Sequence, residues 1–174
     1  MAVALRRLRE DDAEDVFAAF ISSPDMVRQG NVKSQEDANQ YVQALVNPEG
    51  PHRPWAIADL DRLVGLVGVT VDEENRNGWF FYWMARDARG RGWTKSAAAT
   101  VADWALSEGG MFRLELGHRV NNPESGAVAV AAGFVKEGTE RAKFLVDGER
   151  IDVHTYSRLR TDPWPEHVPL PIRQ

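Results

Sequence analysis

Residues 85–105, "ARDARGRGWTKSAAATVADWA", bring glycines and arginines together immediately before an alanine-rich helical pattern. A glycine-rich turn that leads into a helix presents unpaired backbone N–H groups at the positive end of the helix dipole, which suits a phosphate or pyrophosphate. Gly90 and Gly92 would let the backbone approach such an anion closely. The pattern therefore predicts a phosphate-binding loop, and the basic side chains around it are Arg86, Arg89, Arg91 and Lys95.

Two common nucleotide-binding motifs do not fit this loop. A P-loop ending at "KS" would need glycines where the chain has Arg89 and Thr94. A dinucleotide fingerprint beginning at Gly90 would need its third glycine at Lys95. Both nucleotide-binding classes are therefore excluded.

The loop resembles the pyrophosphate loop of the GNAT acyltransferases, in which Gln or Arg is followed by two free positions, Gly, one free position, and Gly or Ala. The segment beginning at Arg89 fits this pattern except at its end, where Thr94 replaces the small residue. The preceding "FFYWMARDARGRG" is similar to a region of the ribosomal-protein N-terminal acetyltransferase branch. The resemblance implies that acetyl-CoA is bound by Arg89, Gly90, Arg91, Gly92, Trp93 and Thr94.

A second segment, "RLELGHRVNNPESGAVAVAAGFVKEG", resembles the stretch of that branch in which an Asn three residues before a Ser opens a helix. These positions are Asn122 and Ser125. From spacing alone, Asn122 is equally well a helix N-cap and Ser125 an exposed residue of the first turn. The resemblance implies that Asn122 hydrogen-bonds the pantetheine and that Ser125 donates a proton to the leaving thiolate.

The fold that the resemblance implies is α/β (α+β): a mixed, mostly antiparallel sheet of six or seven strands flanked by helices. The strand before the loop and the strand "FRLELG" would splay apart to admit acyl-CoA. The backbone of Trp83, Met84 and Ala85 would then pair with the pantetheine amides as an added strand does. We expect one domain over residues 1–174, with an extended proline-rich tail at about residues 161–174.

Acetyl transfer to an amine needs a neutral amine and a protonated leaving thiolate. Many relatives carry a glutamate base on the aromatic strand, but the matching position here is Trp79. The remaining candidates on the second splayed strand are Glu115 and His118, although such residues are more often structural. Histidine titrates near neutral pH, so His118 is the slightly preferred base.

The rest of the sequence predicts the elements that must position these residues. Residues 3–8 form a strand, and Asp11 or Asp12 caps a helix whose apolar face ends at Ile21. Ser34 caps a second helix with Asp37 at its third position. Residues 55–71 form two strands that meet at "DLDR".

The aromatic run "WFFYWM" follows the turn "ENRNG" and is apolar on both faces, so it predicts a central strand with mostly buried side chains. A helix follows the loop, and "MFRLELG" is a further strand. Pro123 starts another helix that Gly133 ends. Asp147 and Gly148 then turn a final hairpin.

Composition narrows the class of protein. The 174 residues carry 21 basic and 26 acidic side chains, a net charge of −5, which argues against a nucleic-acid-binding surface. There is no cysteine, so thiol nucleophiles and thiolate metal sites are excluded, and we expect no metal. Without an apolar run of spanning length, we expect a soluble, cytoplasmic protein and no membrane partner.

Several alternatives stay open from sequence. The acceptor is a primary amine, either a protein N-terminus or a small-molecule amine. A non-catalytic acyl-CoA-binding or regulatory module competes with the enzyme because the expected glutamate is missing. A helix-turn-helix over residues 11–47 is a distant third, since it lacks a basic recognition helix. A homodimer is compatible with all three.

Overall fold

The computed structural model describes residues 3–173. Within them lies a seven-stranded sheet of order β1-β2-β3-β4-β5-β7-β6. Neighbouring strands are antiparallel except β4 and β5, which are parallel. The strands are β1 (Ala4–Arg7), β2 (His52–Asp59), β3 (Arg62–Asp72), β4 (Asn77–Met84), β5 (Arg113–Arg119), β6 (Val135–Val146) and β7 (Glu149–Leu159).

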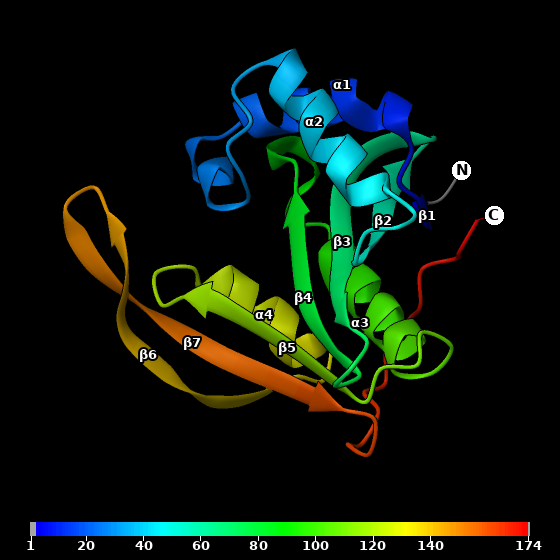
Figure 1. Cartoon of the computed structure of the whole chain (residues 1–174), viewed down its shortest axis with the longest axis vertical. Coiled ribbons are helices and arrows are strands. Elements are labelled where there is room, and N and C mark those ends of the chain that lie inside the picture. Colours follow the sequence, from blue (N-terminus) through cyan, green and yellow to red (C-terminus); the bar gives the residue numbers. More distant parts are fainter. Residues whose placement is uncertain (1–2, 174) are drawn as a thin grey trace.

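Helices cover both faces of this sheet (Figure 1). Helices α1 (Ala13–Ile21) and α2 (Gln35–Val46) pack on one face, where they share a core with Leu66 and Trp83. Helices α3 (Trp93–Leu106) and α4 (Pro123–Ala131) pack on the other, with Val67 and Phe80. The alternation of strand side chains between the two faces therefore builds two cores. Short 3-10 helices complete the connections: η1 (Glu10–Asp12), η2 (Pro24–Arg28) and η3 (Arg86–Ala88).

Strands β4 and β5 pair over only three positions and then diverge, as Figure 1 shows. The pairing begins at Asn77↔Arg113 and ends at Trp79↔Glu115. Between them, a Cβ added to Gly78 would lie 2.4 Å from Val69 and 2.9 Å from Leu114. The missing side chain therefore allows close packing at the base of the V-shaped gap between β4 and β5, which we call the V. This splayed pair is the one that the resemblance implied.

Local sequence patterns predicted most of the helix boundaries and turns correctly. The Ser34 hydroxyl accepts a hydrogen bond from the Asp37 N–H at 3.1 Å, which confirms the predicted cap of α2. The hairpin turns at Asp147 and Gly148, where φ is 49° and 82°, and Gly133 follows α4 with φ 83°. The tail runs beside β1. None of the helices within residues 3–173 is long and apolar enough to cross a membrane.

Three expectations about the first half of the chain and the aromatic strand were wrong. The Asp12 carboxylate does not cap α1, because it holds the Arg6 guanidinium at 2.7 and 2.8 Å and the Arg9 N–H at 2.8 Å. Ile21 is 64% exposed at the end of α1. Trp79 is 47% exposed rather than core, because it stands where β4 and β5 begin to separate.

Candidate active site

The glycine loop presents a row of backbone donors. Gly90 and Gly92 have φ values of 79° and 77°, and no atom lies within 4 Å of a Cβ built on either. The first backbone bond of α3 runs from the Ser96 N–H to the Gly92 carbonyl at 3.3 Å. In the part of the chain that the structure describes, no N–H group of residues 90–95 donates a hydrogen bond. Together with the helix dipole, these donors fit a pyrophosphate.

The basic side chains of the loop do not all point at this site. Arg89 folds back, donating from Nε to the Met84 carbonyl at 3.1 Å and from Nη1 to Asp25 at 2.9 Å. Arg91 stacks on Trp93, with the guanidinium carbon 4.8 Å from the ring centroid. Arg89 therefore fastens the loop to η2, so its contribution to an anion site is the position of the backbone.

The inner edge of β4 has unpaired backbone groups at alternate residues. The Ala85 N–H donates to Val64 at 2.9 Å, so odd-numbered residues of β4 bond to β3. The Arg76 carbonyl accepts from the Phe112 N–H at 2.8 Å, which shows that even-numbered positions face β5. Of the three residues expected to pair with pantetheine, only Met84 faces the V. Ala85 does not fit that role, because its carbonyl also accepts from Ala88 at 3.0 Å.

The start of α4 meets Tyr82 across the V. The Asn122 side chain accepts a hydrogen bond from the Ser125 N–H at 3.4 Å, so Asn122 is the N-cap. The Tyr82 hydroxyl donates to the Ser125 carbonyl at 2.6 Å, and the Ser125 hydroxyl donates to Tyr82 Oη at 3.2 Å. Burial raises the pKa of Tyr82 to about 12, so its phenol stays protonated at neutral pH.

His118 lies on the wall of the V but is firmly held. Its Nδ1 is 2.8 Å from the Arg119 carbonyl, an acceptor, so Nδ1 carries the proton. Its Nε2 is 3.3 Å from the Tyr156 hydroxyl. A Cβ added to Gly126 of α4 would come within 2.8 Å of that nitrogen. Proton transfer to Nε2 therefore passes through or displaces Tyr156.

Glu115 is separated from the other candidates. Its carboxylate accepts from Arg113 Nε at 2.6 Å, and Arg113 also binds Glu137 at 2.6 Å. Two carboxylates share this guanidinium, and the Arg113 contact lowers the pKa of Glu137 to about 2. Glu115 does not line the cleft that His118 and Ser125 share, so the structure argues against it as the base.

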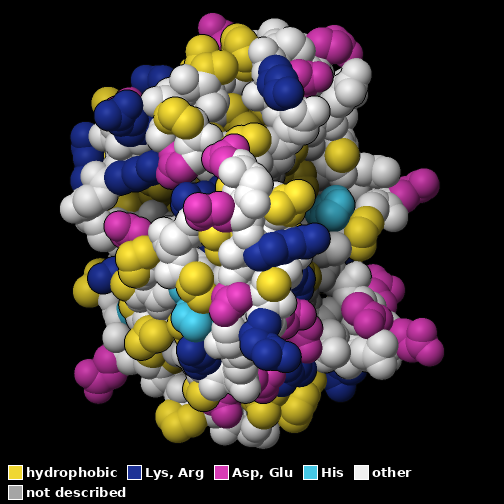
Figure 2. All heavy atoms as spheres, turned by 90° about the vertical axis from the view of Figure 1, so that its left-hand side faces the viewer, with side chains coloured by type: hydrophobic (Ala, Val, Ile, Leu, Met, Phe, Trp, Pro, Cys, Tyr) yellow, Lys and Arg dark blue, Asp and Glu magenta, His cyan; other side chains and the backbone are white. Residues whose placement is uncertain are grey.

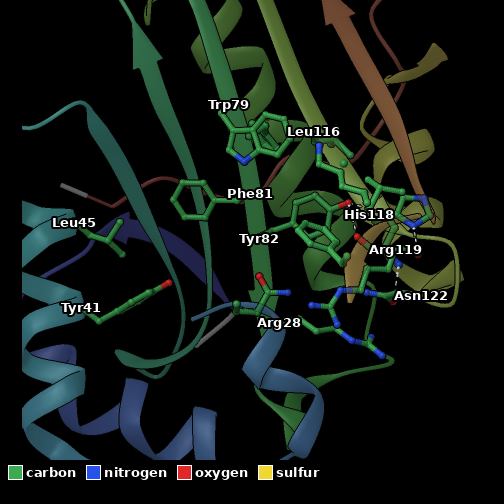
Figure 3. A pocket seen from close by; sticks show the side chains of 17 residues that line it. Arg28, Tyr41, Leu45, Trp79, Phe81, Tyr82, Leu116, His118, Arg119 and Asn122 are labelled. Atoms are coloured by element: carbon green, nitrogen blue, oxygen red, sulfur yellow. Dashed lines mark hydrogen bonds between the residues drawn. The ribbon is translucent and has the colours of Figure 1, made fainter. Parts of the chain in front are cut away.

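The V opens into a cleft of about 410 Å³ that reaches both faces of the sheet. Figure 3 shows Tyr82, His118 and Asn122 on one side of it and Tyr41 and Leu45 of α2 on the other. The α3 and α4 side contains the glycine loop and the N-terminus of α4. The side facing α1 and α2 is lined by Arg28, Gln29, Tyr41, Leu45, Trp79, Phe81, Arg119 and, from β6, Lys143 and Phe144.

Sequence reasoning missed this second side almost completely. No local motif marks Tyr41, Arg28 or Arg119 as residues of a cleft. Their common position follows only from the sheet register and the placement of η2. In residues 3–173, no cluster of three His, Asp or Glu side chains could hold a metal ion.

A mixed sheet divided between two parallel strands, with the unpaired N–H groups of a helix start beside the division, is the arrangement that the resemblance implied for an acyl-CoA-dependent acyltransferase. Residues 3–135 match the acetyltransferase (GNAT) domain family, and the chain belongs to that family. It is an acetyl-CoA-dependent N-acetyltransferase, as the resemblance predicted.

The chain is similar to several characterised acetyltransferases. The chain is 29% identical over 132 residues to the ribosomal-protein-serine acetyltransferase of Escherichia coli, covering 74% of this chain and 73% of that protein. Its fold is similar to RimL, a ribosomal alpha-N-protein acetyltransferase solved with coenzyme A (TM-score 0.82, 21% identity, 91% of this chain and 95% of that one). It is also similar to a chimera of the spermidine N-acetyltransferase SpeG from Vibrio cholerae and hSSAT (TM-score 0.81, 19% identity, 92% and 97%).

Proposed function

We propose that this enzyme transfers the acetyl group directly to the α-amine of a protein N-terminus. The observation that carries the proposal is the cleft between β4 and β5, which opens on both faces of the sheet. An acceptor entering beside α2 can therefore meet a donor bound beside α3 and α4. The chain has no cysteine to carry an acyl group, which supports direct transfer. The similarity to a ribosomal-protein-serine acetyltransferase favours a protein acceptor.

The residues beside α3 and α4 fit the acyl donor. Acetyl-CoA supplies the acetyl group as an activated thioester. The N–H groups of residues 90–95 would bind its pyrophosphate, and the inward-facing backbone of Tyr82 and Met84 would bind its amides. Ser125, whose hydroxyl hydrogen-bonds the neutral Tyr82 phenol, would protonate the departing thiolate.

The acceptor must lose a proton before it attacks. Trp79 occupies the position of the glutamate that many relatives use, and Glu115 is held outside the cleft by Arg113. His118 is the remaining titratable base candidate on the cleft wall, reached through the Tyr156 hydroxyl. We therefore keep His118 as the proposed base.

The acceptor class is tested with acetyl-CoA and three kinds of amine. These are peptides with a free N-terminus, the same peptides blocked at the N-terminus but containing lysine, and spermidine. Thiol release gives the rate, and mass spectrometry locates the acetyl group. We expect acetylation at the α-amine of the free peptides. Turnover with spermidine or lysine side chains and none at α-amines would reject a protein N-terminus as the acceptor.

A further inference from the structure

The cleft is positively charged on the side that faces α1 and α2. Its lining includes Arg28, Arg119 and Lys143, and none of the described lining residues is an aspartate or glutamate. The surrounding surface is different: Figure 2 shows basic and acidic side chains mixed across this face of the molecule. The excess of positive charge therefore belongs to the cleft and not to the surface as a whole.

Two of these cations are not held in an ion pair within residues 3–173, although the negative charge of Asp147 acts on Arg119 at longer range. Among residues 3–173, neither Arg28 nor Arg119 forms an ion pair or a side-chain hydrogen bond. Asp25 interacts electrostatically with Arg28, but its carboxylate already forms an ion pair with Arg89 at 2.9 Å. Lys143 differs, because it is paired with Glu140. Arg28 and Arg119 therefore have guanidinium donors available.

The two guanidinium groups share one end of the cleft. Figure 3 shows Arg28 arriving from η2 and Arg119 from the end of β5. Burial lowers the pKa of Arg119, and the positive charge of Arg28 adds to this shift, while the charge of Asp147 only partly opposes it. Arg119 also lies over the ring of Phe144, with its guanidinium carbon 5.3 Å from the ring centroid, which helps to hold the side chain in place. An anion placed between the two arginines would relieve their repulsion.

The side of the sheet on which Arg119 lies indicates that the anion between the two arginines is not part of the cofactor. Trp79 and Glu115 pair in register, so odd-numbered residues of β5, including Arg119, lie on the side of α1 and α2. Leu116 and His118 point to the opposite side, where α4 packs. The cofactor phosphates already have a separate set of donors in the glycine loop.

We propose that Arg28 and Arg119 bind a carboxylate of the acceptor, so that the enzyme selects N-termini with Asp or Glu next to the acetylated residue. This rests on the proposed function and names its substrate class. Arginine pairs suit a carboxylate because the planar fork donates two parallel hydrogen bonds. A polycationic acceptor is disfavoured, because it would bring further positive charge beside two unpaired guanidinium groups.

The test compares three peptides that differ only at the second residue, Ser-Glu, Ser-Gln and Ser-Lys, with acetyl-CoA saturating. The proteins are wild type, Arg28→Gln, Arg119→Gln and the double variant, with Arg150→Gln as a control that removes one exposed positive charge outside the cleft. We expect wild type to prefer the Glu peptide over the Gln peptide by about 10- to 100-fold in kcat/KM. The double variant should lose this preference, and Arg150→Gln should keep it.

Two further measurements make the outcomes separable. CoA affinity should be unchanged in the double variant. A loss of CoA affinity with the peptide preference retained would assign the arginines to the cofactor and overturn the proposal.

In the second measurement, aspartic acid and its diamide are assayed as small-molecule acceptors. Equal turnover of all three peptides rejects charge selection while the protein acceptor stands. Turnover of aspartic acid alone, without its diamide or any peptide, rejects the protein acceptor while charge selection stands.

Discussion

The phenolic oxygen of Tyr82 lies 2.6 Å from the backbone oxygen of Ser125 and 3.2 Å from its hydroxyl. This pair joins the splayed edge of β4 to the first turn of α4, and it separates two roles of Ser125. The carbonyl holds the two elements together, whereas the hydroxyl is the only part that a Ser125→Ala substitution removes.

We therefore expect Ser125→Ala to lower kcat by about 100-fold, as loss of a general acid does, with little change in CoA affinity. Tyr82→Phe should lower the free energy of unfolding by about 1 kcal/mol, because the half-buried hydrogen bond from Tyr82 to the Ser125 carbonyl is lost. Steady-state kinetics, CoA titration and urea unfolding measure these quantities. A Ser125→Ala enzyme with normal kcat would remove the acid assignment.

Gly92 combines a left-handed backbone with an open anion site. Gly92→Asp places a negative charge where the pyrophosphate would bind, and a pair of unit charges 4 Å apart interacts by roughly 4 kcal/mol at an effective dielectric of 20. Gly92→Asn is the matched control, because Asn tolerates positive φ and adds no charge. We expect calorimetry to show much weaker CoA binding for Asp than for Asn. Similar affinities would mean that the loop does not hold the phosphates.

Asn122 has one structural and one proposed binding role. Asn122→Ala should lower the free energy of unfolding by about 1 kcal/mol through the lost cap, and weaken CoA by about 1 to 2 kcal/mol. Asn122→Ser keeps a capping oxygen, so it should restore stability without restoring CoA affinity. If serine restores both, the contribution of Asn122 is structural alone.

His118 is tested by the pH dependence of kcat/KM with one fixed acceptor. A histidine base predicts that an acidic limb present in wild type disappears in His118→Gln. Glu115→Gln should keep the limb, because Glu115 is held by Arg113 away from the cleft. Tyr156→Phe provides a second test that keeps the imidazole, and it should slow proton transfer. The same profile in all four proteins would show that only the acceptor amine titrates.

Glu137 gives a pH-dependent stability. Its hydrogen bonds from Arg113 and Ser157 hold its pKa at about 2, below the ordinary value of 4.5. A lowered folded-state pKa stabilises the protein above about pH 4.5, and this contribution is lost as pH falls toward 2. The urea midpoint of Glu137→Gln should therefore lie below wild type at pH 6 and approach it at pH 2. Glu149→Gln, exposed on the same hairpin, should show no such convergence.

Short-range signals predicted the backbone features at the starts of α3 and α4. Gly90, Gly92 and the Asn122 cap are each defined by a few neighbouring residues, because positive φ and helix capping are local properties. The splayed strands followed from resemblance, and the structure adds the glycine packing at Gly78 that permits it.

The acceptor side was not predictable in the same way. Arg28 and Arg119 are far apart in sequence and have no motif, so only the sheet register and the position of η2 bring them together. Asp12 looked like a cap because its spacing was right, but a buried arginine on β1 competed for the same carboxylate. A buried ion pair between residues six positions apart therefore overrides the local capping preference of Asp12.

The two outer strands of the sheet differ in how much backbone they leave open. Strand β1 is covered by the tail, since the Leu5 N–H donates to Pro171 at 2.9 Å and the Leu5 carbonyl accepts from Arg173 at 2.8 Å. Strand β6 forms the opposite edge and is exposed along most of its length. Edge-to-edge strand pairing therefore has one available side per molecule. Because the tail occupies the outward-facing backbone groups of Leu5 at the centre of β1, it hinders the addition of a further copy at that edge and so works against open-ended fibre growth.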